Sequence, residues 1–170
     1  MNPLNEAISQ DLQWQHPNMF QRVYELRGNA TELFATLQYR GMVSSQAIGE
    51  ASGVHLVFQL EGIIKSRCIV TDAETNTAVA SIQRKARGGT VVLTNGKQYE
   101  WSKLNFWGTN WGWLDVNHQS VVTFSRNKHL EFAPSIEHAL DDLPLLAMLG
   151  WYLLLLQRSE AATTAAVSSV

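Results

Sequence analysis

Five basic side chains form the densest cluster of charge in the sequence, and they are the first candidates for chemistry. The cluster consists of Arg84, Lys85 and Arg87, joined by Lys65 and Arg67 from a segment that we expect to pair with theirs. Guanidinium and ammonium groups bind phosphate, and each adds about 1 kcal/mol of attraction near an anionic membrane surface. The cluster therefore indicates either a weak site for an anion or a phospholipid head group, or the ordinary solvated end of a hairpin.

A second candidate is a dense group of aromatic residues within residues 101–113. Its members are Trp101, Phe106, Trp107, Trp111 and Trp113. One interpretation is core packing on two strands and the turn between them; the other is an exposed rim, formed by Trp107 and Trp111, that touches a membrane or a partner. Stacking on nucleic acid also needs a cationic groove, and only Lys103 lies within this segment, so we expect no nucleic-acid binding.

Patterns typical of catalytic or metal sites are missing from the sequence. The five histidines, at positions 16, 55, 118, 129 and 138, include no pair at helical spacing and have no cysteine partner, so we expect no metal site. The chain has no G-x-S-x-G motif and no phosphate-binding loop, and we assign the acidic pair Asp141-Asp142 to helix capping. We expect no catalytic residue and no cofactor; an enzyme whose groups converge from distant strands stays as an alternative.

The single cysteine and the N-terminus bear on the compartment. Cys68 lies between apolar residues, Ile63-Ile64 before it and Ile69-Val70 after it, which favours a buried, inert thiol. One cysteine forms no intrachain disulfide, which suits a reducing compartment. Residues 1–6 lack the basic and apolar regions of a secretory signal. We therefore expect a cytoplasmic protein, at most peripheral to a membrane.

Length and composition indicate one folded domain. The chain has 170 residues, of which 45% are hydrophobic and 16% charged, with 13 basic and 15 acidic residues and a net charge of −2. The usual charged share is about 25%, so neither a disordered polyelectrolyte nor a basic nucleic-acid-binding chain fits. We divide the chain into an extension over 1–20 with a short helix, a domain over 21–158, and a tail over 159–170 that is disordered or a loose helical extension.

Residues 21–133 have the pattern of a strand-rich fold. Val54, Leu56, Phe58 and Leu60 alternate with other residues, which places them on one face of a strand. Asn95-Gly96 stands between two runs rich in β-branched and aromatic residues and predicts a hairpin with a type I′ turn. Counting runs between turn signals gives about ten to twelve strands. No helix-length segment separates them, so we expect antiparallel pairing.

The run Leu143–Leu156 has no polar side chain except one tyrosine hydroxyl. It predicts a helix over about 143–157, with a length of about 21–24 Å against about 30 Å for the hydrocarbon core of a bilayer. A helix that is apolar on all sides must be enclosed by lipid or protein. Closed barrels of eleven or so strands hold a central helix, so we predict a mainly β protein: an antiparallel closed barrel of about 12 strands around this helix. The alternative is a tail-anchored membrane protein that uses 143–156.

The pattern of strands, turns and terminal helix resembles the tubby C-terminal-like barrel superfamily, which includes tubby proteins, phospholipid scramblases and LURP-one-related proteins. The resemblance covers about 23–158. It rests on the strand pair 69–85, the hairpin 95–101 and the helix 143–156. It implies that the last helix threads the barrel. Some tubby proteins bind phosphoinositides and scramblases are associated with calcium and lipid, but no site residue of theirs is carried over to this chain. We therefore expect a non-enzymatic binding or scaffold domain, with anionic membrane lipid as the candidate partner.

Overall fold

The computed structural model describes residues 1–29, 31–134 and 136–168. Within them the chain forms a 3-10 helix η1 (Leu4–Ala7), twelve strands, a second 3-10 helix η2 (Glu137–Asp142) and the helix α1 (Leu143–Ser168). The strands are β1 Leu12–Gln15, β2 Val23–Gly28, β3 Glu32–Tyr39, β4 Ala47–Ala51, β5 Val54–Glu61, β6 Arg67–Asp72, β7 Ala78–Lys85, β8 Gly88–Leu93, β9 Gln98–Lys103, β10 Trp111–Leu114, β11 Ser120–Phe124 and β12 His129–Phe132.

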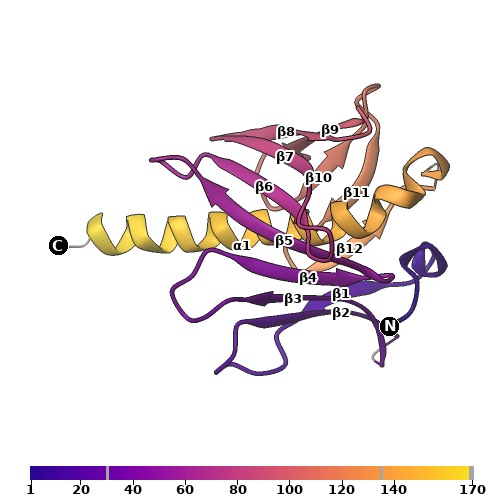
Figure 1. The fold of residues 1–170 in the computed structure, drawn as a ribbon, viewed down its shortest axis with the longest axis horizontal. Helices are drawn as coiled ribbons and strands as arrows, with labels where there is room; N and C mark the ends of the chain where they lie inside the picture. Colours follow the sequence, from indigo (N-terminus) through magenta and orange to yellow (C-terminus); the bar gives the residue numbers. More distant parts are fainter. Residues whose placement is uncertain (30, 135, 169–170) are drawn as a thin grey trace.

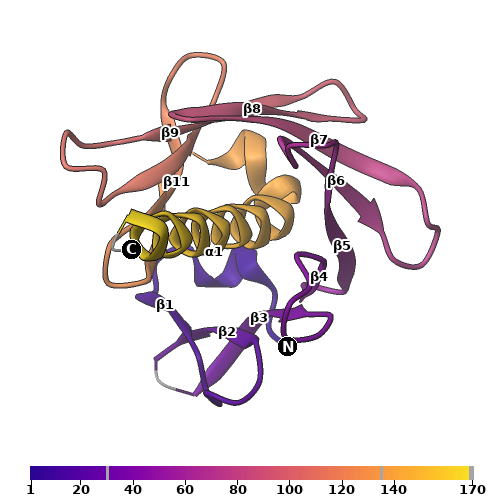
Figure 2. The same cartoon turned by 90° about the vertical axis from the view of Figure 1, so that its left-hand side faces the viewer.

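The strands form one closed antiparallel barrel in which each strand pairs with its neighbours in the sequence. The barrel closes where β1 pairs with β12, with Leu12 opposite Leu130. Figure 2 shows the strands as a ring with α1 running through it. The predicted fold class, a closed antiparallel barrel of about 12 strands around a C-terminal helix, is confirmed.

Helix α1 lies against β4, where small residues face it. On β4 the inward positions are Ala47, Gly49 and Ala51, all buried. A side chain at Gly49 would overlap the sulfur of Met148 on the helix, which shows that the Met148 side chain packs directly on the backbone of β4. On the helix itself, Gly150 leaves room for the ring of Phe124 from β11. Close packing of this kind replaces the lipid that an apolar helix otherwise needs.

Burial of the helix distinguishes the two interpretations of the apolar run. Helix α1 with η2 is long and apolar enough to cross a membrane by length and composition, yet 83% of its most apolar window is buried inside the protein. Thirteen of the fourteen residues from Leu143 to Leu156 are buried. Hydrogen bonds also hold the buried part of the helix: Trp113 Nε1 donates to the Leu146 carbonyl at 2.8 Å, and the Tyr152 hydroxyl donates to the carbonyl of Ser45, in the loop between β3 and β4, at 2.6 Å.

Two predictions at the ends of the chain need correction. The helix expected within residues 1–20 is limited to the single 3-10 turn of η1, and Leu12 belongs to strand β1 instead, because its side chain faces the barrel core. The barrel therefore begins before residue 21. At the other end, the helix predicted to end at about 157 continues to Ser168. Of the two alternatives for the tail, the helical extension is therefore confirmed for its described part.

The hairpin at Asn95-Gly96 forms as predicted, but its turn is of another type. Gly96 has a φ of +86°, and Asn95 is not among the residues with positive φ. The Gly96 amide donates to the Leu93 carbonyl, and the Leu93 amide donates to the Lys97 carbonyl, both at 2.9 Å. This is the three-residue loop in which a type I turn is followed by a left-handed glycine. The extra residue sets the register of β8 against β9, with Val92 opposite Gln98.

Candidate functional site

The antiparallel order places six of the connecting loops at the end of the barrel where α1 leaves it. Successive loops of such a barrel alternate between its two ends, so the loops 16–22, 40–46, 62–66, 86–87, 104–110 and 125–128 share one end. The Tyr152 bond to Ser45 and the ion pair of Glu160 with Arg84 show that the helix leaves at this end. We call these loops, the residues within two positions of them, and helix residues 155–168 the exit face; it points toward the viewer in Figure 2.

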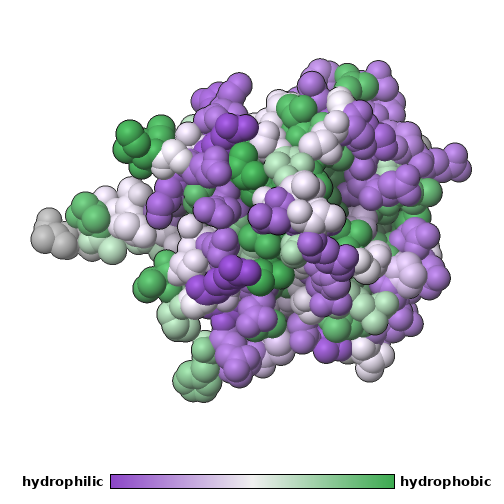
Figure 3. Space-filling view, viewed as in Figure 1, coloured by the Kyte–Doolittle hydropathy of each residue, from purple (hydrophilic) through white to green (hydrophobic). Residues whose placement is uncertain are grey.

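Four of the six exit-face loops present a pair of adjacent, large apolar side chains to solvent. The pairs are Met19-Phe20, Met42-Val43, Ile63-Ile64 and Phe106-Trp107, and their exposures range from 70% to 104%. Among the described residues twelve large hydrophobic side chains are exposed, and these eight are two thirds of them. In Figure 3 hydrophobic side chains project at the left, around the protruding helix. Single exposed apolar residues are ordinary, but four such pairs on one end are not.

Basic residues, like the apolar pairs, are concentrated at the exit face. The exit face holds eleven of the 13 basic residues and two of the 15 acidic ones, Glu61 and Glu160, for a local formal charge of +9. The cations are Arg22, Arg40, Lys65, Arg67, Arg84, Lys85, Arg87, Lys103, Arg126, Lys128 and Arg158. Two basic and 13 acidic residues remain for the rest of the chain, a charge of −11. The net charge of −2 thus conceals a strongly polarised molecule.

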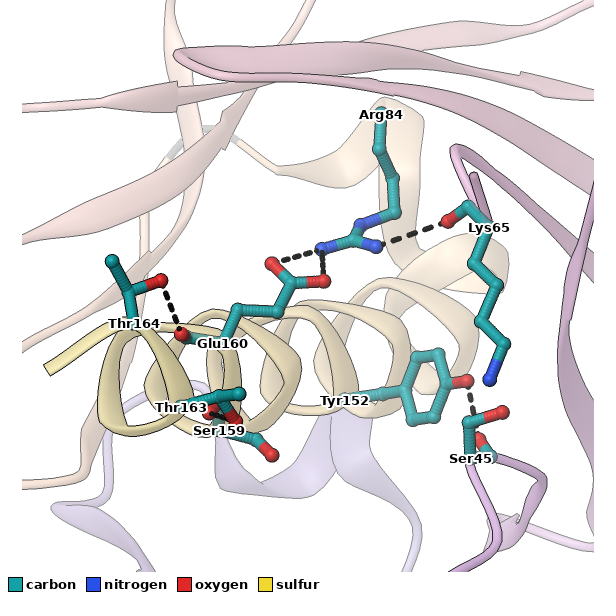
Figure 4. A network of polar contacts seen from close by, with 8 residues as sticks. All are labelled: Ser45, Lys65, Arg84, Tyr152, Ser159, Glu160, Thr163 and Thr164. Carbon is teal, nitrogen blue, oxygen red and sulfur yellow. Dashed lines mark hydrogen bonds and ion pairs between the residues drawn. The ribbon is translucent and has the colours of Figure 1, made fainter. Parts of the chain in front are cut away.

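The predicted basic cluster lies on the exit face, but its members are not equivalent. Strands β6 and β7 are neighbours, with Arg67 opposite Gln83, so the expected pairing of the two segments is confirmed. Lys65, Arg67, Lys85 and Arg87 are exposed. Arg84 is only 16% exposed, and its guanidinium is bound in two ways (Figure 4): Nη2 lies 2.8 Å from both carboxylate oxygens of Glu160, and Nη1 donates to the Lys65 carbonyl. Arg84 thus anchors the helix, which leaves four exposed cations in this cluster.

The aromatic group divides between core and surface. Trp101, Trp111 and Trp113 are buried, and Trp101 and Trp111 stack with ring centroids 5.5 Å apart. The predicted rim is therefore wrong for Trp111, which is an inward-facing residue of β10. Trp107 is 82% exposed at the tip of its loop, as a rim requires, and its partner there is Phe106, with ring centroids 5.4 Å apart.

Sequence reasoning missed Ile63-Ile64, which counted only as part of the apolar surroundings of Cys68. Their side chains are 104% and 83% exposed, whereas Cys68 is fully buried and burial raises the pKa of its thiol to about 12. The signal was present in the sequence: Gly62, which has a φ of +88°, and Lys65 flank the pair and mark it as a loop. A turn that carries two large β-branched residues at its tip is unusual.

Backbone contacts hold the loop 40–46 in place and so fix the direction in which its apolar pair points. The Nη1 atom of Arg22 donates to the carbonyls of Met42 and Ser44, at 3.1 and 2.8 Å, while the guanidinium lies 3.7 Å above the ring of Tyr39. Between this loop, the loop 62–66 and the helix is an open cavity of about 570 Å³. Ser45, one of the residues that line it, accepts the Tyr152 hydroxyl bond that Figure 4 shows.

The opposite end of the barrel holds the start of α1 by a buried polar contact. The Tyr99 hydroxyl donates to Asp142 Oδ2 at 2.6 Å, and Lys97 Nζ lies 2.9 Å from the same oxygen. Burial and the neighbouring carboxylate raise the pKa of the Tyr99 hydroxyl. Asp142 was expected to cap the helix, but its carboxylate is turned to the barrel wall instead. Within the described residues, no three His, Cys, Asp or Glu side chains gather as a metal site.

This contact gives a first prediction. The Tyr99→Phe variant should lower the free energy of unfolding by about 1.5–3 kcal/mol, because a buried carboxylate loses a hydrogen-bond donor. Urea unfolding followed by circular dichroism measures the change. Tyr24→Phe, which removes a hydroxyl from a half-buried ring on β2, is the control. Equal stability of Tyr99→Phe and the native protein would show that the hydroxyl does not contribute to holding the helix.

Fold and exit face define a class of protein, a closed twelve-stranded barrel with an axial helix and a polarised, apolar-tipped end. Comparisons of the chain with family models, curated proteins and solved structures found no match. The resemblance to tubby-like barrels accordingly stays a prediction.

Proposed function

We propose that the protein is a peripheral membrane-binding module that docks on anionic lipid surfaces with its exit face and catalyses no reaction. One observation carries the proposal: the four exposed apolar pairs and eleven of the 13 basic residues occupy the same end of the barrel. A protein interface usually concentrates its apolar area in one packed patch. Separate apolar tips surrounded by cations fit a membrane interface better, because each tip enters the lipid independently while the cations meet the head groups.

The energies are of the right size for reversible binding. Complete transfer of a large apolar side chain from water contributes about 1.5–3 kcal/mol, and partial entry at the interface contributes less. Each cation near an anionic leaflet adds about 1 kcal/mol, and this share is screened by salt. In the docked orientation the free end of α1 points toward the membrane, and the opposite end of the barrel, which holds most of the acidic residues, faces away from the anionic surface.

Flotation with vesicles tests the proposal. The protein should float with vesicles that contain phosphatidylglycerol, float less with pure phosphatidylcholine, and lose part of its binding as salt rises. If equal fractions of the protein float with both vesicle types, or if salt does not change binding, the exit-face cations do not contribute to binding by attraction to anionic lipid. No flotation under any condition would reject the proposal as a whole.

A paired substitution examines the predicted basic cluster directly. Lys85→Gln combined with Arg87→Gln should weaken binding to anionic vesicles about ten- to thirtyfold at low salt, since two contributions of about 1 kcal/mol are lost. The matched control, Ala73→Glu combined with Val116→Glu, changes the net charge equally but at exposed positions of the other end. If both double variants bind equally weakly, total charge rather than the exit face governs binding.

A further inference from the structure

The last eight described residues of α1 extend beyond the barrel at the exit face. Figure 1 shows this segment, residues 161–168, projecting past the loop tips. All eight side chains are exposed, and none is charged. At 1.5 Å per residue the segment is about 12 Å long. We call it the helix extension. Docking of the exit face on a flat surface therefore requires the extension either to bend aside or to enter that surface.

The polar groups of the helix extension are arranged for a dry environment. Its hydroxyls belong to Thr163, Thr164 and Ser168, and each donates to the backbone carbonyl four residues earlier, at 3.0, 3.0 and 2.9 Å. The Thr163 and Thr164 bonds are visible in Figure 4. In lipid, polar groups must find partners within the protein, and a helix satisfies its backbone internally except for the carbonyls of its last turn, which need water or head groups as partners. Because these three hydroxyls already donate to backbone carbonyls, they leave no hydrogen-bond donor without a partner. The remaining residues of the helix extension are Ala and Val.

Charge stops at the base of the helix extension. Arg158 and Glu160 are the last charged residues of the described chain, and both are engaged at the rim of the barrel: Glu160 with Arg84, and Arg158 5.2 Å above the ring of Trp151. The ion pair neutralises the one carboxylate of the helix that would otherwise face an anionic surface. The boundary between charged rim and uncharged extension thus coincides with the level at which the docked exit face would meet the membrane.

We infer that the helix extension inserts into the bilayer when the exit face docks. The head-group layer is about 5–8 Å deep on each side of the hydrocarbon core, so an extension of about 12 Å spans it and places Val167 against the ends of the acyl chains, while the free carbonyls of the last turn stay within reach of head groups and water. Insertion rests on the proposed membrane binding: the apolar pairs and the cations supply most of the affinity, and the extension fixes the orientation of the barrel.

A fluorescent probe on the extension tests this inference. Ala165→Cys introduces an exposed thiol for an environment-sensitive fluorophore, while native Cys68 is buried and unreactive. On vesicles containing phosphatidylglycerol we expect the probe to shift to shorter wavelength, to be quenched by lipids brominated on the acyl chain, and to be protected from aqueous iodide. Ala73→Cys, at the other end of the barrel, is the control and should keep its accessibility to iodide.

Flotation of the same labelled protein separates the two proposals. If labelled Ala165→Cys floats but its probe stays open to iodide, the extension lies outside the lipid and this inference is wrong, while membrane binding stands. If it does not float and unlabelled protein does not either, the proposed function fails as well. A probe shielded equally without vesicles would also overturn the inference, because another part of the protein would then cover it.

A charged substitution gives a second readout. Ala165→Asp should lower vesicle binding about tenfold, because a carboxylate is costly inside lipid. Its unfolding temperature should stay close to that of the native protein, since position 165 is exposed in the fold. Ala73→Asp, with the same change in charge at the other end, should bind like the native protein. Unchanged binding of Ala165→Asp contradicts insertion.

Discussion

Replacement of Leu149 by Asp should abolish the cooperative fold of the whole domain. Leu149 is 0% exposed in the middle of the buried part of α1, the helix around which the strands close. A carboxylate at this position either stays ionised without water around it or takes up a proton, and both states cost free energy. An uncompensated buried charge costs several kcal/mol. Domains are stable by about 5–15 kcal/mol, so the loss is of the same size as the stability itself.

Circular dichroism and thermal unfolding of Leu149→Asp measure this effect. Leu149→Ala should keep the fold but lose about 2–5 kcal/mol, the usual cost of a cavity in a core. Ala162→Asp, at an exposed position on the same helix, is the control and should unfold near the native temperature. Should Leu149→Asp melt at the native temperature, the helix cannot be the core of the barrel. Leu153→Asp should unfold the domain in the same way, because Leu153 is only 2% exposed.

The largest expected effect on binding comes from the loop 104–110. The double variant Phe106→Ser, Trp107→Ser should weaken vesicle binding about a hundredfold, because two aromatic side chains, 91% and 82% exposed, no longer enter the interface. Each side chain should contribute about 1–1.5 kcal/mol to the free energy of binding, half of what complete burial would contribute. Tryptophan prefers the interfacial layer, where the ring is apolar and its N–H stays hydrated. Binding isotherms on vesicles with phosphatidylglycerol measure the loss.

Stability and binding are separable in this variant. The loop is fixed by its own contacts, since the Asn105 side chain bonds to Thr109 and Asn110, so the exposed tip carries little of the folding energy. We expect an unfolding temperature close to the native one. Val116→Ser, at an exposed apolar residue of the opposite end, should bind normally. A hundredfold loss in that control too would mean that exposed apolar area, rather than the exit face, determines binding.

The cations and the apolar tips should differ in their response to salt. Substitutions at Lys85 and Arg87 should matter most at low ionic strength, because surface charges are screened over about 8 Å at physiological salt. Substitutions at Phe106 and Trp107 should matter under both conditions, since apolar transfer is insensitive to screening. A salt-dependent effect of the cations together with a salt-independent effect of the apolar tips would show that the two kinds of residue contribute to binding by different forces.

Much of the fold follows from local features of the sequence. The alternation along residues 54–60 makes a strand with Leu56 and Phe58 buried, and Asn95-Gly96 makes a hairpin even though the turn type differs. The apolar run 143–156 required an apolar enclosure, and the strand count supplied it. Local patterns failed at Leu12. Leu4, Ile8 and Leu12 are spaced four apart, as in a helix, but the pairing of Leu12 with Gly28 and Leu130 outweighs this weak helical preference.

The sequence by itself determined a barrel, its central helix and the presence of a basic cluster near residue 85. Only the tertiary structure decided that one end is cationic and apolar-tipped while the other is acidic. Pairs such as Ile63-Ile64 and Met42-Val43 lie far apart along the chain. The opposite charges of the two ends nearly cancel in the net charge of −2, which therefore does not reveal them. Closure of the antiparallel barrel sends alternate loops to the same end, and that alternation turns scattered residues into a single surface.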